Sequence, residues 1–345
     1  MKKGEFELIA RLTAKLRQRR RTILGPGDDC AILARPPAAQ LITIDSVVEG
    51  VHFDLRWGSA EALGARALTV NLSDIAAMGG VPTACVINLA IRPGLGARFF
   101  DRLYAGLGGA ADAAGVDLVG GNVTAGDALA ITIALLGETG PRVLRRDAAR
   151  AADEIFVTGT VGDAALGWRI LAGKLRVRGA PRKFLIDRFL LPSARLSAGQ
   201  CLARMSLAPV GRVNPPARIA ARNRAARVAA IDLSDGLMQD LGHVLDRSGV
   251  AAEIDANAIP RSPAYRTVMG DDLELALSGG EDYELLFCLP PGHSPSALAR
   301  RLGLPVTRIG KIVRGRGATL IGDDGVRTKI ASRTAGWDQL RAQNS

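Results

Sequence analysis

Apolar and polar positions follow two periods along the chain, and these periods predict helices and strands. Apolar residues spaced three and four apart indicate amphipathic helices, whereas short apolar runs that end at Gly, Pro or Asp indicate strands. The helices are expected over residues 5–20, 59–78, 97–114, 162–171, 236–248 and 294–302. The strands are expected over residues 41–45, 83–91, 129–136, 154–158, 229–231, 283–289 and 306–312. Because the two kinds alternate irregularly, the pattern favours an α+β or mixed α/β fold over one doubly wound sheet.

The pattern breaks between residues 137 and 152, where Pro, Arg and Gly replace the apolar periodicity. A chain of 345 residues fits two domains. We therefore predict an N-terminal domain over residues 1–140 and a C-terminal α/β domain over residues 150–345. Two further breaks are expected, a glycine turn at 120–122 and a basic loop at 172–183.

The predicted helix 59–78 carries a carboxylate in an apolar run. Ser59 is the expected N-cap, and the helix is expected to end at the pair Gly79 and Gly80. Asp74 lies between Leu72 and the segment Ile75–Met78, so we expect it to be buried. A buried carboxylate costs several kcal/mol unless it is paired or bound to a metal. Lys is almost absent nearby, so the sequence favours a metal ion as its partner.

Other aspartates stand at the ends of apolar segments. A single such Asp is usually a cap or a turn residue, but six in comparable places suggest a shared role. Hard oxygen ligands of this kind suit Mg²⁺, which keeps phosphate oxygens and waters in its other positions. The set consists of Asp28, Asp29, Asp45, Asp74, Asp232 and Asp235.

Several enzyme classes are excluded by missing motifs. Gly173-Lys174 and Gly310-Lys311 are followed by Leu and Ile, so the chain has no P-loop ending in Ser or Thr. No G-x-G-x-x-G follows a strand, no G-x-S-x-G occurs, and the three His residues lack zinc spacing. Classical P-loop, dinucleotide-binding and serine-hydrolase chemistry are therefore not expected.

The charge and the cysteine content indicate which partners and which cellular compartment to expect. The net charge of +11 comes from dispersed Arg residues, and no aromatic RNA-binding motif accompanies them, so we expect no nucleic-acid partner. No apolar run is long enough to span a bilayer, and the N-terminal residues lack the apolar core of a signal peptide. The four cysteines form no Cys-x-x-Cys motif. We expect a cytoplasmic protein with free thiols and no membrane partner.

The motifs, taken together and in order, resemble those of thiamine-monophosphate kinases, which belong to the aminoimidazole-ribonucleotide-synthetase-like ATP-binding superfamily. The resemblance covers nearly the whole chain. One departure is Asn122, which stands where the family's Gly-Gly-Asp-Thr motif has Asp. The matching segments are residues 5–9, 27–31, 45–53, 71–79, 232–237, 279–286 and 336–338.

The resemblance implies a two-domain fold of this superfamily and a homodimer in which the N-terminal sheets of two copies pair. It implies transfer of a phosphoryl group from ATP to thiamine monophosphate with several Mg²⁺ ions. The implied metal ligands are Asp29, Thr43, Ile44, Asp45, Asp74, Asn122, Asp232 and Asp235. The implied ATP contacts are Tyr104, Gly121, Asn122, Arg146 and Ser234. The implied thiamine-phosphate contacts are His52, Glu281 and Trp337.

The chemistry agrees with the absence of a catalytic base. The acceptor is itself a phosphate whose second pKa is about 6, so it is largely ionised at neutral pH. We therefore expect positioning and metal electrostatics to carry catalysis, with no catalytic side chain. Two alternatives stay open: an ATP-dependent enzyme of the same superfamily with another acceptor, and a nucleotide-binding protein without turnover.

Overall fold

The computed structural model describes residues 12, 19, 22–24, 32–34, 39–140, 142–206 and 228–330. The chain forms two compact units. Unit 1 covers Met1–Ile75 and Val81–Gly140, and unit 2 covers Ala76–Gly80 and Pro141–Ser345. Within the described ranges, no helix is long and apolar enough to cross a membrane.

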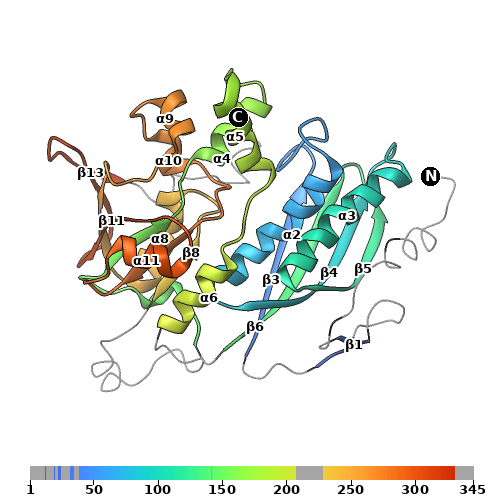
Figure 1. Cartoon of the computed structure of the whole chain (residues 1–345), viewed down its shortest axis with the longest axis horizontal. Coiled ribbons are helices and arrows are strands. Elements are labelled where there is room, and N and C mark those ends of the chain that lie inside the picture. The colour runs from blue at the N-terminus through green and yellow to red at the C-terminus, as the bar shows by residue number, and fades with distance from the viewer. Residues whose placement is uncertain are drawn as a thin grey trace. The chain divides into compact units, whose positions relative to one another are not determined.

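Unit 1 is built on a four-stranded sheet with the strand order β3-β6-β4-β5. Helices α2 and α3 lie side by side on one face of this sheet (Figure 1). A separate antiparallel pair joins β1 and β2. The elements are β1 (Thr22–Leu24), β2 (Ile32–Leu33), β3 (Ala39–Val48), α2 (Ala60–Ala77), β4 (Val81–Ile91), α3 (Ala97–Ala114), β5 (Asp117–Ala125) and β6 (Ala130–Thr139). The last two residues of α2 belong to unit 2.

The two faces of the unit 1 sheet differ in burial. Along β6, Ile131, Ile133 and Leu135 are buried on the face that α2 and α3 cover. Their neighbours point to the opposite face, because side chains alternate along a strand. That face, which we call the open face, carries Ile42 and Ile44 of β3, which are 75% and 64% exposed. Large exposed apolar side chains of this kind are typical of an interaction surface.

Helices α2 and α3 pack at unusually close range because glycines stand at their crossing. A Cβ atom on Gly64 would lie 2.0 Å from the Leu103 carbonyl oxygen, and one on Gly106 would lie 1.9 Å from the Glu61 carbonyl oxygen. Only glycine leaves room for backbones this close.

Unit 2 contains a seven-stranded sheet with the order β13-β12-β9-β11-β7-β10-β8. Ile155 and Val157 of β7 pack into one hydrophobic core, whereas Phe156 between them packs into a second core with Phe287. The alternation places apolar layers on both faces of the sheet. The elements are η1 (Arg146–Ala148), β7 (Glu154–Thr158), α4 (Asp163–Leu171), α5 (Gly179–Leu190), α6 (Leu196–Met205), β8 (Ala229–Asp232), α8 (Leu237–Ser248), β9 (Ala251–Asp255), α9 (Pro263–Met269), α10 (Glu274–Ser278), β10 (Leu285–Leu289), α11 (Pro295–Leu302), β11 (Val306–Val313), β12 (Gly317–Ile321) and β13 (Arg327–Ile330).

Most predicted elements are confirmed, and three predictions need correction. The expected glycine turn at 120–122 is wrong, since β5 runs through it. A Cβ on Gly121 would lie 2.2 Å from the Ile87 carbonyl oxygen, so this glycine allows β5 to approach β4. Strand β3 continues past Asp45 to Val48. The expected loop at 172–183 includes the start of α5 at Gly179. The predicted helix 5–20 lies outside the described residues except for Leu12 and Arg19.

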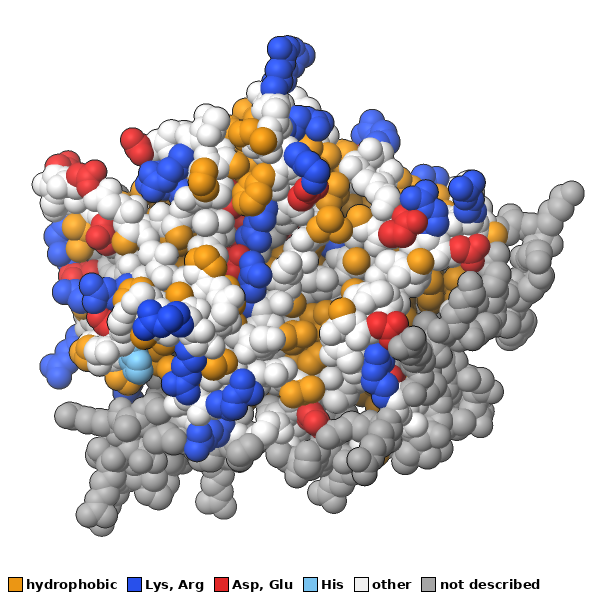
Figure 2. All heavy atoms as spheres, in the orientation of Figure 1, with side chains coloured by type: hydrophobic (Ala, Val, Ile, Leu, Met, Phe, Trp, Pro, Cys, Tyr) orange, Lys and Arg blue, Asp and Glu red, His pale blue; other side chains and the backbone are white. Residues whose placement is uncertain are grey.

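Positive charge is dispersed on the face of the molecule that Figure 2 shows. On the face drawn in Figure 2, Lys and Arg side chains stand among apolar and acidic ones rather than in one continuous patch. The described cysteines are free thiols: Cys85 and Cys288 are buried, and Cys201 is partly buried. Cys30 lies outside the described residues.

Candidate active site

In unit 1, Thr43 and Asp74 are brought together by the packing of α2 on β3. The Thr43 hydroxyl donates a hydrogen bond to Asp74 Oδ2. Asp74 is half-buried, not fully buried as the sequence predicted, although Ser73 and Ile75 beside it are inaccessible to solvent. Asp45 lies two residues from Thr43 and so points to the same side of β3. Three oxygen-bearing side chains therefore share one region of unit 1.

This donor set fits Mg²⁺. Hydroxyl and carboxylate oxygens are hard ligands, and Mg²⁺ in phosphoryl-transfer sites is usually held by one or two carboxylates. Asp45 and Asp74 supply the carboxylates and Thr43 supplies a hydroxyl. Asp28 and Asp29, which the sequence analysis placed with them, lie outside the described residues.

Asn122 lies on the open face, away from Thr43 and Asp74. Its Nδ2 donates to Asn88 Oδ1 at 3.0 Å. The strand register aligns Asn122 with Asn88, Thr132 and Ser46, and the last two share a hydrogen bond of 2.7 Å between their hydroxyls. Strands β3 and β5 form opposite edges of the sheet, about 14 Å apart at about 4.8 Å per strand. Within one chain, Asn122 and Asp45 therefore do not share an ion.

Two more predicted contacts lie in unit 1. Tyr104 of α3 is largely enclosed, and burial, with a smaller effect of nearby Cys85, raises the pKa of its phenol to about 12. Its hydroxyl is therefore neutral at physiological pH and can donate a hydrogen bond. His52 accepts the Val48 N–H at Nδ1 at 3.1 Å, which leaves Nε2 as the proton-bearing nitrogen of a neutral ring.

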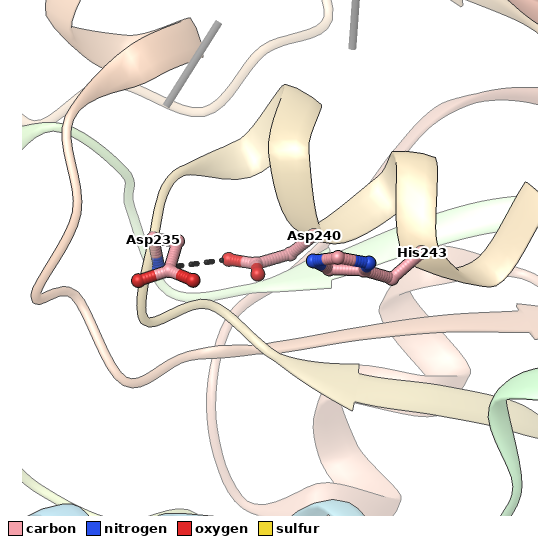
Figure 3. Close-up of side chains that lie close together, drawn as sticks. All are labelled: Asp235, Asp240 and His243. Carbon is pink, nitrogen blue, oxygen red and sulfur yellow. Dashed lines mark hydrogen bonds between the residues drawn. The ribbon is translucent and has the colours of Figure 1, made fainter. Parts of the chain in front are cut away.

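In unit 2, acidic residues gather around the loop between β8 and α8. Strand β8 ends at the buried Asp232, and α8 begins two residues after Asp235. Asp240, in the first turn of α8, accepts the N–H group of Asp235 at 3.1 Å (Figure 3). It also accepts the N–H group of Gly236 at 3.1 Å. The ligand atoms of Asp235, Asp240 and His243 lie within 4.8 Å of one another. The Asp240 cap therefore fixes the loop that presents Asp235.

The electrostatics of this loop favour a positively charged partner. Burial raises the pKa of Asp235, and the hydrogen bond from Gln239 opposes that rise. Burial raises the pKa of Asp240 well above its usual value, and the charges of Asp232 and Asp235 add to the effect. Carboxylates that lie close together and are partly buried from water are stabilised by a bound cation or by a proton.

Sequence reasoning missed Asp240 and His243. Asp240 stands five residues after Asp235 and inside the first turn of the predicted helix 236–248. An acidic residue there is a common helix-stabilising choice, so it gave no separate signal.

Other predicted residues of unit 2 lie around the same loop. Ser234 accepts the Glu281 N–H at its carbonyl oxygen at 2.8 Å. The charges of Glu281 and Arg146 both act on Asp235, so these side chains lie near it. The structure thus brings Arg146, Ser234, Asp235 and Glu281 together. Trp337 lies outside the described residues.

Comparisons with known proteins cover both units. Residues 27–139 match the family model of the AIR synthase related protein, N-terminal domain, and residues 207–323 match that of its C-terminal domain. A thiamine-monophosphate kinase of Salmonella typhimurium is 39% identical over 322 residues, which span 90% of each chain.

Solved structures agree with these matches. The crystal structure of a thiamine-monophosphate kinase from Stenotrophomonas maltophilia K279a has a TM-score of 0.78 and 35% identity, and the match covers 94% of this chain and 98% of that one. A structure of AaThiL complexed with AMPPCP and TMP has a TM-score of 0.71 and 32% identity, and the match covers 97% of this chain and 96% of that one.

Proposed function

Because this chain belongs to the thiamine-monophosphate kinase family, we propose that it transfers the terminal phosphoryl group of ATP to the phosphate of thiamine monophosphate. The products are thiamine diphosphate and ADP. The observation that carries the proposal is the similarity to a relative complexed with AMPPCP and TMP over almost the full length of both chains. The oxygen-rich clusters at Asp74 and Asp235 support it, since transfer between two anions needs cationic help.

The reaction needs no proton abstraction by the protein. The attacking oxygen belongs to a phosphate that is largely ionised at neutral pH, because its second pKa is about 6. The side chains therefore act by holding the two substrates in line and by stabilising charge on the transferred group. Residues that bind and orient the two substrates are therefore sufficient, and we assign no catalytic base.

The proposal assigns magnesium-binding roles in each unit. In unit 1 the ligands would be Thr43, Asp45 and Asp74, and in unit 2 Asp232 and Asp235. When bound, Mg²⁺ supplies positive charge that reduces the repulsion between ATP and the acceptor phosphate. Asp240 supports Asp235 by capping its backbone N–H. By resemblance, Asp29 and the backbone of Ile44 would add oxygen ligands.

The remaining contacts follow the chemistry of the substrates. Arg146 offers a guanidinium to phosphate oxygens, and Tyr104 offers a neutral hydroxyl to the nucleotide. Gly121 and Ser234 would complete the ATP contacts. His52 would contact the acceptor phosphate, and Glu281 the thiamine part, whose thiazolium ring is cationic. Trp337 would pack against the substrate's aromatic rings.

We also propose that two copies pair through the open face of the unit 1 sheet. Ile42, Ile44 and Val86 leave large apolar surface exposed there. The separation of Asp45 and Asn122 on opposite edges of the sheet supports this pairing. If both residues serve one metal site, they come from two different copies.

The function is tested by incubating the protein with ATP, Mg²⁺ and a panel of acceptors, and by separating the products chromatographically. We expect thiamine diphosphate from thiamine monophosphate and no diphosphate from unphosphorylated thiamine. A protein that binds ATP but forms no thiamine diphosphate contradicts the proposed acceptor.

A further inference from the structure

The segment Glu281–Glu284 has an unusual backbone. Glu281 has a φ of +74° and Tyr283 a φ of +52°, in the left-handed region that side-chain-bearing residues rarely adopt. Each such residue costs on the order of 1 kcal/mol or more and persists only where its surroundings enforce it. Glu281 and Tyr283 flank Asp282, so two nearby positions both have a costly backbone conformation. Such a segment indicates a role other than stability.

The enforcing contacts come from the residues between and after them. The buried side-chain carboxyl group of Asp282 accepts the Gly162 N–H at 2.6 Å and the Ala164 N–H at 3.2 Å, at the start of α4. The buried Glu284 carboxylate accepts two hydrogen bonds from Arg195, at 2.7 and 2.5 Å. Two buried anchors therefore fix the backbone on which Glu281 and Tyr283 stand.

The backbone of the segment is also tied to the acidic loop. The Glu281 N–H donates to the Ser234 carbonyl and the Tyr283 N–H to the Leu233 carbonyl, both at 2.8 Å. A Cβ on Gly280 would lie 2.4 Å from the Ser234 carbonyl oxygen, so the two segments are in close backbone contact. Glu281 is thereby held beside Asp235.

Tyr283 acts directly on Glu281. Its hydroxyl donates a hydrogen bond to Glu281 Oε2 at 2.9 Å, and Tyr283 as a whole is buried, with 7% of its surface exposed. A carboxylate oxygen accepts hydrogen bonds, so the bond donated to Oε2 fixes the direction in which the Glu281 carboxylate is turned. The left-handed backbone of both residues is what brings the phenol to the carboxylate two positions earlier.

We propose that Tyr283 is a positioning residue, whose hydroxyl orients the Glu281 carboxylate toward a cationic or hydrogen-bond-donating group on the thiamine part of the acceptor. This inference rests on the proposed function. It adds to that function a residue that sets the affinity for the acceptor through Glu281.

The test is the variant Tyr283→Phe, which removes one hydroxyl and keeps the ring. We expect the KM for thiamine monophosphate to rise about tenfold, the loss of one hydrogen bond to a charged group. We expect kcat and the KM for ATP to change less than about twofold, because phosphoryl transfer is untouched. In a Glu281→Gln background, adding Tyr283→Phe should change the KM for thiamine monophosphate by less than about twofold.

Tyr265→Phe is the matched control. Tyr265 is also buried, and its hydroxyl donates to the Asp272 carbonyl at 3.1 Å and accepts the Ala276 N–H at 3.0 Å. This variant should lower the melting temperature and leave the KM for thiamine monophosphate unchanged. A Tyr283→Phe variant that behaves like Tyr265→Phe overturns the inference, because it reveals a structural role only.

Calorimetric binding of thiamine monophosphate separates the inference from the proposed function. A wild-type protein that binds no thiamine monophosphate overturns both. A wild-type protein that binds it, with equal affinity in Tyr283→Phe, overturns the positioning role and leaves the function standing. If Tyr283→Phe binds thiamine monophosphate more weakly than the wild-type protein does, that result supports the inference even where turnover is slow.

Discussion

Asp74 illustrates what can be read from single residues. Its place in an apolar helical run predicted a functional carboxylate, and the structure gives it a hydrogen bond from Thr43 on β3. That partner could not be predicted from the residues alone, because 31 positions separate the two and only the packing of α2 on the sheet joins them. The half-burial of Asp74 likewise depends on packing rather than on its apolar neighbours in sequence.

The variant Asp74→Asn should lose at least about a hundredfold in kcat while it stays folded. The amide keeps the size of the side chain and an oxygen for the Thr43 hydroxyl, but it removes the charge that a metal ligand needs. Turnover and the circular-dichroism melting curve check this together. An unfolded product would assign Asp74 a structural role instead.

The buried carboxyl group of Asp282 should make the free energy of unfolding depend on pH. Full burial raises the pKa of this carboxyl to about 8 from 3.8. Between about pH 4 and pH 8 the folded chain keeps a proton that the unfolded chain releases, so the free energy of unfolding falls as the pH rises. One group contributes at most about 1.4 kcal/mol per pH unit.

Urea unfolding between pH 5 and pH 8 measures this dependence. We expect a lower midpoint at pH 8 than at pH 5.5, and a smaller difference in Asp282→Asn. Burial shifts the pKa of Asp163 and Asp240 in the same direction, so the variant should reduce the slope without abolishing it. Equal slopes in the two proteins would refute the assignment to Asp282.

At the scale of elements, the periodic segments were predicted well and the contact-dependent ones were not. Helix α3 has the predicted bounds, since its apolar residues recur at helical spacing up to Gly115. Strand β5 was misread at Gly120 and Gly121, because glycines that permit close strand approach look like turn residues in sequence. Helix α5 was not predicted, because only two of its residues, Leu185 and Phe189, are buried and they give little helical periodicity.

The crossing of α2 and α3 gives a stability prediction at this scale. Gly106→Ala should destabilise unit 1 by about 3 kcal/mol, because the new methyl group would overlap the Glu61 carbonyl. Gly109→Ala in the same helix is the control, since its Cβ would meet no atom within 4 Å. It should stabilise α3 by about 0.5–1 kcal/mol, as alanine generally does in a helix interior. Chemical denaturation that ranks the two variants equally would contradict the close-packing account.

At the scale of the whole molecule, the proposed pairing depends on the open face of the unit 1 sheet. Ile42→Arg would place a charge in that apolar surface, so we expect the variant to run as a monomer where the wild-type protein runs as a dimer. Light scattering after size-exclusion chromatography measures the mass directly. Val326→Arg is the control, because Val326 is also exposed, at 56%, but lies between β12 and β13 of unit 2. A monomeric wild-type protein would rule out the pairing.

The overall function was predictable because its motifs lie along nearly the whole chain, whereas the grouping of the site residues required the structure. Asn122 is the clearest case. The resemblance implied that Asn122 and Asp45 are both metal ligands, yet the strand order puts the two at opposite edges of one sheet. Strand order is set by long-range pairing, which a single sequence does not reveal.

Direct phosphoryl transfer is the central claim, and labelled ATP tests it most directly. The protein is mixed with Mg²⁺, thiamine monophosphate and ATP labelled at the γ-phosphate, in a single turnover with enzyme in excess. We predict that the label appears in thiamine diphosphate in a one-to-one ratio with ADP, and that Asp74→Asn forms both products at least about a hundredfold more slowly. Label released as inorganic phosphate, or ATP bound without any ADP formed, would contradict the account.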